Sequence, residues 1–520
     1  MPRRRFTFTA KQVGTMLLVV LADILVFGPW RTPAVGIFAL GWAGVVLATV
    51  PHARRGGALV AGVVALLLGG VLLDDPSVLG WISFWIALAL TALLARRRFD
   101  DASRWAERLV MHGLLGLAAP LRDARTLSKI KRGDRPSLRA ILATIALPLI
   151  GSASFLALFA GANPLIGDAF AAAALPDGTT MLLHAVIWAG AILCVWPSVR
   201  PFPAALGFGR PSDIGRSLPH VPAGTLSLSL LCFNIVFGLQ NVLDIVFLWS
   251  GAPLPGTVTL ADYAHRGAYT LIATASLAGL FVLIALRPDS EAARSRPVRR
   301  LLILWIAQNV LLVASSALRL MDYIAAYSLT VPRISALAWM GLVAVGLVLV
   351  CWRLLANRSA AWLINTNAAA AALVLLAASA VDLGTVAARW NVRHARAERD
   401  LDLCYLHALG ASALLPLMEL EQRVAGDALR DRVAFVRDAA LQDALARQAE
   451  PITASLRNAR RIDAAVAALE AHPRRIQAGP RGCDGTIIPP DDSPAVVLPP
   501  PASPGTVADQ TAALTKDAQR

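Results

Sequence analysis

Charged side chains are scarce in this sequence, and their scarcity excludes an ordinary soluble protein. Asp, Glu, Lys and Arg make up 16% of the 520 residues, whereas soluble domains usually contain about 25%. Hydrophobic residues make up 56%, and the mean hydropathy is +0.59. Because the apolar residues form runs too long for β-strands, the sequence predicts an all-α, polytopic membrane protein.

Cysteine is also rare, and metal-binding arrangements of it are absent. The chain has five cysteines with no Cys-x-x-Cys pair and no Cys/His cluster, so we predict no metal site and no cofactor. Cys194, Cys232 and Cys351 lie in apolar segments and are most simply small core residues. Cys404 and Cys483 lie outside those segments, and they are our candidates for a disulfide; two unrelated thiols are the alternative.

The signatures of common enzymes are missing as well. The sequence contains no Walker A motif, no HExxH and no GxSxG, and no dinucleotide fingerprint. An enzyme is therefore not favoured. One enzymatic alternative stays open, an intramembrane transferase that would use Asp262, His265 or Asp322 as its general base.

Eleven apolar segments are long enough, or nearly so, to cross a bilayer, although several early ones are shorter than the ~20 residues that a straight span prefers. The predicted spans are residues 13–28, 33–50, 58–73, 78–95, 139–162, 181–199, 225–249, 268–286, 301–324, 334–352 and 363–386. The first span follows three arginines, and a signal peptide is the rival interpretation. No small-x-small cleavage site follows cleanly, so we predict an uncleaved helix.

The spans and the composition divide the chain into five regions. Residues 1–95 form N-terminal membrane helices, 96–139 a basic loop, 140–386 the main bundle, 387–475 a helical region and 476–520 a Pro-rich disordered tail.

The net charge of +15 is distributed as in membrane proteins, not as in nucleic-acid-binding ones. The predicted outer segments hold only Arg31, Arg266, Arg319 and Arg333 among the basic residues of the membrane part. By the positive-inside rule the N-terminus is predicted to be cytoplasmic and the C-terminal region to lie on the opposite side of the membrane. No basic face with interleaved aromatics appears, so nucleic acid is not a predicted partner.

The basic loop at 96–139 has two interpretations of equal weight. Trp105, Leu109 and Leu114 alternate with charged residues as in an interfacial amphipathic helix, and the arginines and lysines that follow would meet anionic lipid. The alternative is a solvated loop that only fixes the topology.

Two predicted spans carry polar stripes. In 225–249 the polar residues fall on one third of the helix surface; they are Asn234, Gln240, Asn241 and Asp244. In 301–324 a second stripe includes Gln308, Ser315, Arg319, Asp322 and Tyr323. Such residues normally face other helices or a wet cavity, because lipid cannot satisfy them.

These stripes predict polar contacts whose purpose stays open. Asp244 with the asparagines would hold a proton or cation, or the amides simply join helices. Arg319 and Asp322 are spaced to pair within one helix. An outward pocket in which Arg266 and Arg319 bind an anion is one hypothesis, and an interfacial aromatic belt is the other. The residues expected near that entrance include Tyr263, Tyr323 and Tyr327.

Three pieces of sequence resemble one known family. They are Tyr263-Ala264-x-Arg266-Gly267, then Ser315, Arg319, Tyr323 and Tyr327 at four-residue spacing before Leu329-Thr330 and Arg333, and finally Ala388-Arg389-Trp390-Asn391 with Leu401-Asp402-x-x-Tyr405-Leu406. Together they resemble the bacterial polytopic membrane proteins grouped as the domain of unknown function numbered four-one-seven-three, with a close neighbour numbered four-one-five-three.

The resemblance covers roughly residues 226 to 417. Ser328 stands where the family commonly has glycine. The resemblance implies a membrane class and brings no established activity. The first hypothesis is accordingly a non-enzymatic, structural or envelope-associated subunit, and the rival is an ion-coupled transporter or lipid-handling permease.

Overall fold

The computed structural model describes residues 2–28, 32–123, 178–207, 223–249, 295–395, 401–471 and 476–488. In these ranges the regular secondary structure is helical apart from one isolated antiparallel bridge, between Arg481 and Ile487. Among the described residues, seven helices are long and apolar enough to cross a membrane, and two shorter apolar helices accompany them. The prediction of an all-α, multi-pass membrane bundle is confirmed. The predicted spans at 139–162 and 268–286 lie outside the described residues.

The first group of helices forms a bundle around Trp42. It contains α1 (Pro2–Phe27), α2 (Ala34–Thr49), α3 (Gly56–Asp74), α4 (Val78–Leu94) and α9 (Gly178–Val199). Small residues let these helices approach closely: a Cβ on Gly36 would lie 2.2 Å from the Leu73 backbone. The buried Trp42 indole donates to Ser198 Oγ at 2.7 Å, which joins α2 to α9.

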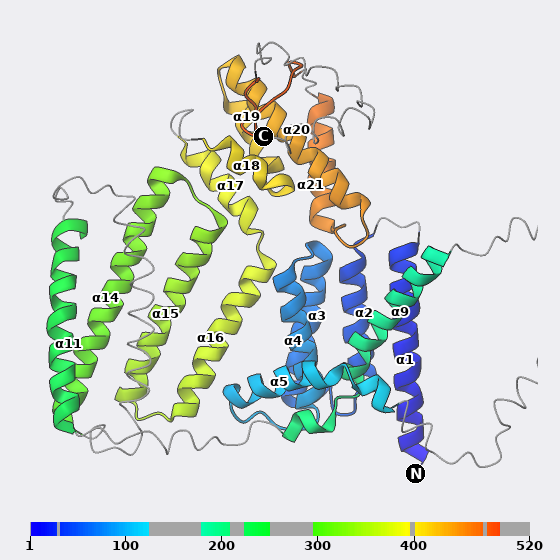
Figure 1. Ribbon diagram of the computed structural model, residues 1–520, viewed down its shortest axis with the longest axis horizontal. Coiled ribbons are helices and arrows are strands. Elements are labelled where there is room, and N and C mark those ends of the chain that lie inside the picture. The colour runs from blue at the N-terminus through cyan, green and yellow to red at the C-terminus, as the bar shows by residue number, and fades with distance from the viewer. Residues whose placement is uncertain are drawn as a thin grey trace, which may run out of the picture.

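The second group stands beside the first (Figure 1). It contains α11 (Ala223–Asp244), the π-helical turn η2 (Ile245–Trp249), α14 (Arg296–Tyr327), α15 (Val331–Leu355) and α16 (Ala360–Ala380). Helix α16 packs against α4 and so connects the two groups. Many large apolar side chains on the outer faces are exposed, among them Leu67, Leu228, Leu239 and Leu373, as expected where lipid is the solvent.

The last predicted span, 363–386, is interrupted in the structure. Helix α16 ends at Ala380, and α17 (Leu383–His394) begins after an N-cap in which Asp382 accepts a hydrogen bond from the Thr385 amide at 3.1 Å. An aspartate placed before a helix satisfies a free amide there, so the chain starts a new helix.

The predicted basic loop contains a helix, α5 (Ala102–Gly116), which lies across the end of the bundle near the N-terminus (Figure 1). Its buried face carries Trp105, Arg108 and His112. Arg108 pairs with Asp100 at 2.7 Å and holds the pKa of that carboxyl well below its usual range. Burial, helped by nearby Arg96, lowers the pKa of His112 to about 4, so this face is fixed by packing with a neutral imidazole.

A separate helical domain, the C-terminal domain, covers the opposite end of the bundle (Figure 1). Besides α17 it contains α18 (Leu403–Ala408), η4 (Gly410–Ala413), α19 (Leu414–Arg423), α20 (Asp427–Ala449) and α21 (Leu456–Ala471), packed around a core that includes Leu406, Leu414 and Val436. Gly410 has φ +52°, and a Cβ there would lie 2.3 Å from Asp443 Oδ2, so only glycine fits that close approach.

The end of this domain is held by a disulfide. Cys404 and Cys483 are bonded, which brings residues 79 apart in sequence together. The bond fixes the segment 476–488, at the start of the region predicted as a disordered tail, against α18. In that segment Asp484 also pairs with Arg432 of α20 at 2.8 Å. The predicted tail from 489 onward lies outside the described residues.

Candidate functional site

The two predicted polar helices lie side by side and run in the same direction. Asn234 donates to the Leu301 carbonyl at 3.0 Å, and Asn241 donates to the Gln308 carbonyl at 3.3 Å. Both helices advance by seven residues between these contacts, so the contacts recur after two turns on the same line. We call this line the polar seam; it comprises Asn234, Asn241 and Asp244 of α11 with Gln308, Ser315 and Arg319 of α14.

A buried ion pair lies in the half of the polar seam nearer the C-terminal ends of α11 and α14. Arg319 forms a salt bridge with Asp244, and the two side chains are only 7% and 0% exposed. Gln240 also donates to the same carboxylate oxygen, at 2.9 Å. Because a desolvated charge interacts far more strongly with a partner than a solvated one does, this pair fixes the register of α11 against α14.

The sequence pointed to a different partner for Arg319. Spacing along one helix suggested Asp322, but that side chain is exposed, and the salt bridge of Arg319 reaches across to Asp244. The expected pairing within α14 is therefore wrong. Local spacing shows which residues are near in one helix, whereas the alignment of two helices decides which charge is desolvated.

A π-helical turn follows Asp244 immediately. The next contact on α11 after Asn241 is made by Trp249, eight residues later. The facing contacts on α14, at Gln308 and Ser315, are only seven residues apart, and the wider π-helical turn of η2 accommodates the extra residue. As a result the Trp249 indole donates to Ser315 Oγ at 3.1 Å. Single π-helical turns occur often at functional sites, and this one ends the polar seam.

Several acceptor oxygens in the polar seam have no donor. Asn234 Oδ1, Asn241 Oδ1, Asp244 Oδ2 and Gln308 Oε1 are buried and find no hydrogen-bond partner within the described ranges. Each such buried acceptor costs roughly 1–3 kcal/mol. A row of oxygens beside one carboxylate can accept hydrogen bonds from a ligand or coordinate a cation. The polar seam is therefore suited to either kind of binding.

The tyrosines of the family-like motif lie beyond the polar seam. The rings of Tyr323 and Tyr327 are 4.7 Å apart at the end of α14, and the Arg333 guanidinium lies 4.5 Å from the Tyr323 ring. Arg333 also donates to the Tyr327 carbonyl at 2.5 Å. These residues surround the turn between α14 and α15. Tyr263 and Arg266, expected nearby, lie outside the described residues, as do Asp262 and His265.

Two other motif residues fasten that turn to the C-terminal domain. The Asn391 amide donates to the Leu329 carbonyl at 2.9 Å and accepts from the Leu329 amide at 2.6 Å. Tyr405 Oη accepts from the Val331 amide at 2.9 Å. We call these contacts the turn clamp. The sequence identified Asn391 and Tyr405 as parts of a motif but assigned them no role. The available signal was Asn391, because an asparagine side chain can bond both the N–H and the C=O of another residue's backbone.

A second attachment, the docking network, joins α21 to the ends of two membrane helices. Arg457 forms salt bridges with Asp74 at 2.6 Å and Asp75 at 2.9 Å, and Arg461 pairs with Asp382. Burial alone would raise the pKa of Asp382, but hydrogen bonds from Thr385 and Arg461 outweigh burial and hold the pKa below its ordinary value. Sequence reasoning missed this network because its charges are far apart along the chain.

One further polar contact joins α1 to α9. His184 Nδ1 lies 2.5 Å from Asp23 Oδ1, and the Trp188 indole donates to the same oxygen at 2.8 Å. The structure pairs them between two helices that the sequence could not align.

Comparison with known proteins supports the family and nothing more specific. No curated protein and no solved structure matches the chain. The family described as Domain of unknown function (DUF4153), the second of the two neighbouring families in the resemblance, matches residues 59–420. This range includes the polar seam, the turn clamp and the first two helices of the C-terminal domain, and the chain belongs to the DUF4153 family.

Proposed function

We propose that this multi-pass protein is a non-enzymatic, envelope-associated subunit that holds a rigid helical domain on the outer side of a bacterial inner membrane. The observation that carries the proposal is the turn clamp. Residues of the family-like motif, Asn391 and Tyr405, make backbone contacts that fix the C-terminal domain to the α14–α15 turn. A scaffold requires such a fixed attachment, because a partner bound to the domain must keep its position relative to the membrane.

The proposal is tested by asking whether a partner depends on the attachment. The chain would be purified from membranes with native lipids and examined by native mass spectrometry. We expect a protein partner in a fixed ratio, and we expect the Asn391→Ala, Tyr405→Phe double variant to lose that partner while still inserting in the membrane. A chain that purifies alone, or a partner equally retained by the double variant, would contradict the proposal.

The orientation belongs to the same proposal. The distribution of basic residues places the N-terminus in the cytoplasm and the C-terminal domain outside. It is supported by the placement of α5 and the C-terminal domain at opposite ends of the bundle (Figure 1). A periplasm-active reporter fused after Arg399 should be active, and fusions after Arg125 or Arg296 should be inactive. A cytoplasmic location of the first fusion would show that the number of spans before Arg399 is even, which would contradict the proposed orientation.

A second candidate function, ion-coupled transport, is favoured by the unpartnered oxygens of the polar seam. One carboxylate oxygen of Asp244 pairs with Arg319, and the other has no donor in the described ranges. A carboxylate that takes up a proton or a cation needs such a free oxygen. In proteoliposomes carrying a pH or sodium gradient, Asp244→Asn should abolish any ion flux. Asp322→Asn, the same change at an exposed position of α14, should leave flux unaltered. No flux by the unaltered protein would exclude this candidate.

The basic region adds a lipid partner to the proposal. Helix α5 lies flat across the inner end of the bundle, and its outer surface exposes Val110, Leu114 and Leu117. A helix with an exposed apolar stripe among basic residues binds at an interface that contains anionic lipid.

A further inference from the structure

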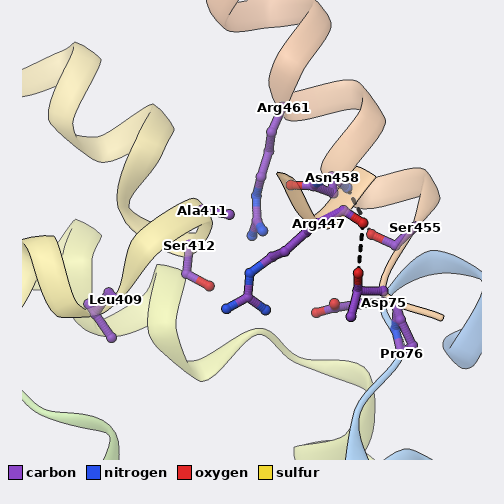
Figure 2. A pocket seen from close by; sticks show the side chains of 10 residues that line it. Asp75, Pro76, Leu409, Ala411, Ser412, Arg447, Ser455, Asn458 and Arg461 are labelled. Carbon is purple, nitrogen blue, oxygen red and sulfur yellow. Dashed lines mark hydrogen bonds between the residues drawn. The ribbon is translucent and has the colours of Figure 1, made fainter. Parts of the chain in front are cut away.

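A pocket lies where the C-terminal domain meets the outer end of the first helix group (Figure 2). Its cavity volume is about 90 Å³, and it is partly open to solvent. Three parts of the chain line it: the α3–α4 connection, the α18–η4 turn, and α20 with α21. The lining residues used below are Asp75, Ser412, Arg447, Ser455 and Asn458.

The pocket has one cationic group with donors to spare. Arg447 is anchored by its Nε, which donates to Asp443 Oδ2 at 2.9 Å, and its side chain is 57% exposed. In Figure 2 the far end of this guanidinium extends into the opening toward Ser412. The two terminal nitrogens of an arginine in this position match two oxygens of a phosphate. The other lining arginine, Arg461, is already paired with Asp382.

The beginning of α21 forms an adjoining part of the lining. Ser455 caps this 16-residue helix by accepting from the Asn458 amide at 3.1 Å. A helix N-terminus carries partial positive charge and favours an anion nearby. Together with Arg447 it makes this side of the pocket suited to a negatively charged group.

A buried acceptor in the same part of the lining lacks its donor. Asn458 is 4% exposed, and its Nδ2 donates to the Ala444 carbonyl at 2.7 Å and to Gln448 at 3.2 Å. These two acceptors fix the orientation of the amide, so Oδ1 points the other way, where it finds no partner among the described residues. In Figure 2 this oxygen lies on the side that faces Arg461. A buried oxygen of this kind is stabilised when a hydroxyl or amine group donates a hydrogen bond to it.

We propose that this pocket binds a polyol phosphate of the glycerol phosphate type, with the phosphate on Arg447 and the hydroxyls on Asn458 Oδ1 and Asp75. Arg447 uses only its Nε among the described residues, Asn458 Oδ1 has no donor there, and Asp75 is paired with Arg457 through Oδ2. This combination suits a ligand that has both an anionic group and hydroxyl donors. The pocket adjoins the outer end of α3, so the same group can arrive free in solution or as the headgroup of phosphatidylglycerol. This inference does not depend on the proposed scaffold function.

Two measurements on the full-length protein test the proposal and separate the sources. In the first, sn-glycerol 3-phosphate is titrated calorimetrically into the protein in phosphatidylcholine nanodiscs. In the second, the melting temperature is compared between phosphatidylglycerol and phosphatidylcholine nanodiscs. Arg447→Gln should weaken binding of the soluble probe at least tenfold or abolish the stabilisation by phosphatidylglycerol, because it removes a charge-assisted pair.

Arg460→Gln is the matched control. Arg460 is also exposed and also ion-paired, with Asp74, but it does not line the pocket, so its variant should bind as the unaltered protein does. Arg447→Lys keeps the charge without the planar fork and should give an intermediate effect. The melting temperature in phosphatidylcholine verifies that each variant is folded. The proposal is overturned if neither probe binds, or if Arg447→Gln and Arg460→Gln have equal effects.

Discussion

At the scale of single residues, the most unusual backbone position is Ser328, in the turn that the turn clamp holds. Its φ of 69° and ψ of 162° define a region that is essentially restricted to glycine and costs another residue about 1–3 kcal/mol. The family resemblance of the sequence implies glycine at this position. The strain persists because Asn391 and Arg333 hold the residues on both sides.

Ser328→Gly should therefore stabilise the protein. Removal of the strain outweighs the additional freedom that glycine gives the unfolded chain, about 0.5–1 kcal/mol, so we expect a gain of about 1 kcal/mol in unfolding by SDS in mixed micelles. Asn357 also has a positive φ, of 50°, but asparagine tolerates that region. Asn357→Gly should give no gain, and equal effects of the two changes would show that strain at Ser328 is not the cause.

The Asp244–Arg319 pair is a second residue-scale prediction. Asp244→Ala leaves the Arg319 charge in the polar seam without its carboxylate, and breaking a buried pair in this way costs about 3–5 kcal/mol. Changing both to Ala and Met should cost less than the sum of the single changes in an SDS unfolding cycle. Asp322→Ala, on an exposed residue of α14, should change stability by less than about 0.5 kcal/mol. Additive losses would show that the two charges act independently.

At the scale of elements, local information predicted the helices well and their partners poorly. The length of an apolar run is a property of neighbouring residues, which is why α3, α11 and α15 could be placed from sequence. The end of α16 was missed, since Asp382 terminates an apolar run that continues past it. Contacts such as Arg457 with Asp74 depend on how separate helices align, and no periodicity in a single sequence contains that information.

The amphipathic helix α5 gives a prediction of its own. Leu114 is 63% exposed on the side away from Trp105, and we expect it to enter an anionic bilayer surface. An environment-sensitive dye on Leu114→Cys, in a chain whose three free cysteines are replaced by serine, should shift to the blue in phosphatidylglycerol nanodiscs. The same labelled chain in phosphatidylcholine is the control. A spectrum typical of water in both lipids would assign α5 to the solvated-loop interpretation.

At the scale of the whole molecule, the C-terminal domain is attached to the membrane helices at two separate places. The turn clamp holds it to α14 and α15, and the docking network holds it to α3 and α16. The two attachments engage both helix groups, so the domain fixes their relative position as well as its own. The motif residues Asn391 and Tyr405 therefore contact the α14–α15 turn in order to attach the domain.

The disulfide completes this domain, and a bond of this kind is expected where the proposed orientation places the domain, outside the cytoplasm. Cys404 lies in the first turn of α18, and Cys483 lies in the last described segment, where the buried side chain of Arg481 pairs with Asp431 at 2.6 Å. A cross-link that closes a loop of this length stabilises by roughly 4 kcal/mol in chain-entropy models. Cysteine thiols stay reduced in the cytoplasm, whereas disulfides form in an oxidising compartment.

The alkylation of intact protein before and after reduction tests this bond directly. Both cysteines should be unlabelled before reductant and labelled after it, as read by peptide mass spectrometry. The Cys404→Ser, Cys483→Ser double variant should unfold more easily, and trypsin should then cleave at Arg481, which the bond otherwise keeps packed against Phe435. The exposed Arg460 of α21 serves as the reference site, because its cleavage should change little. Full labelling of either cysteine before reduction would mean that the segment is held by noncovalent contacts alone, among them the ion pairs of Arg481 and Arg432.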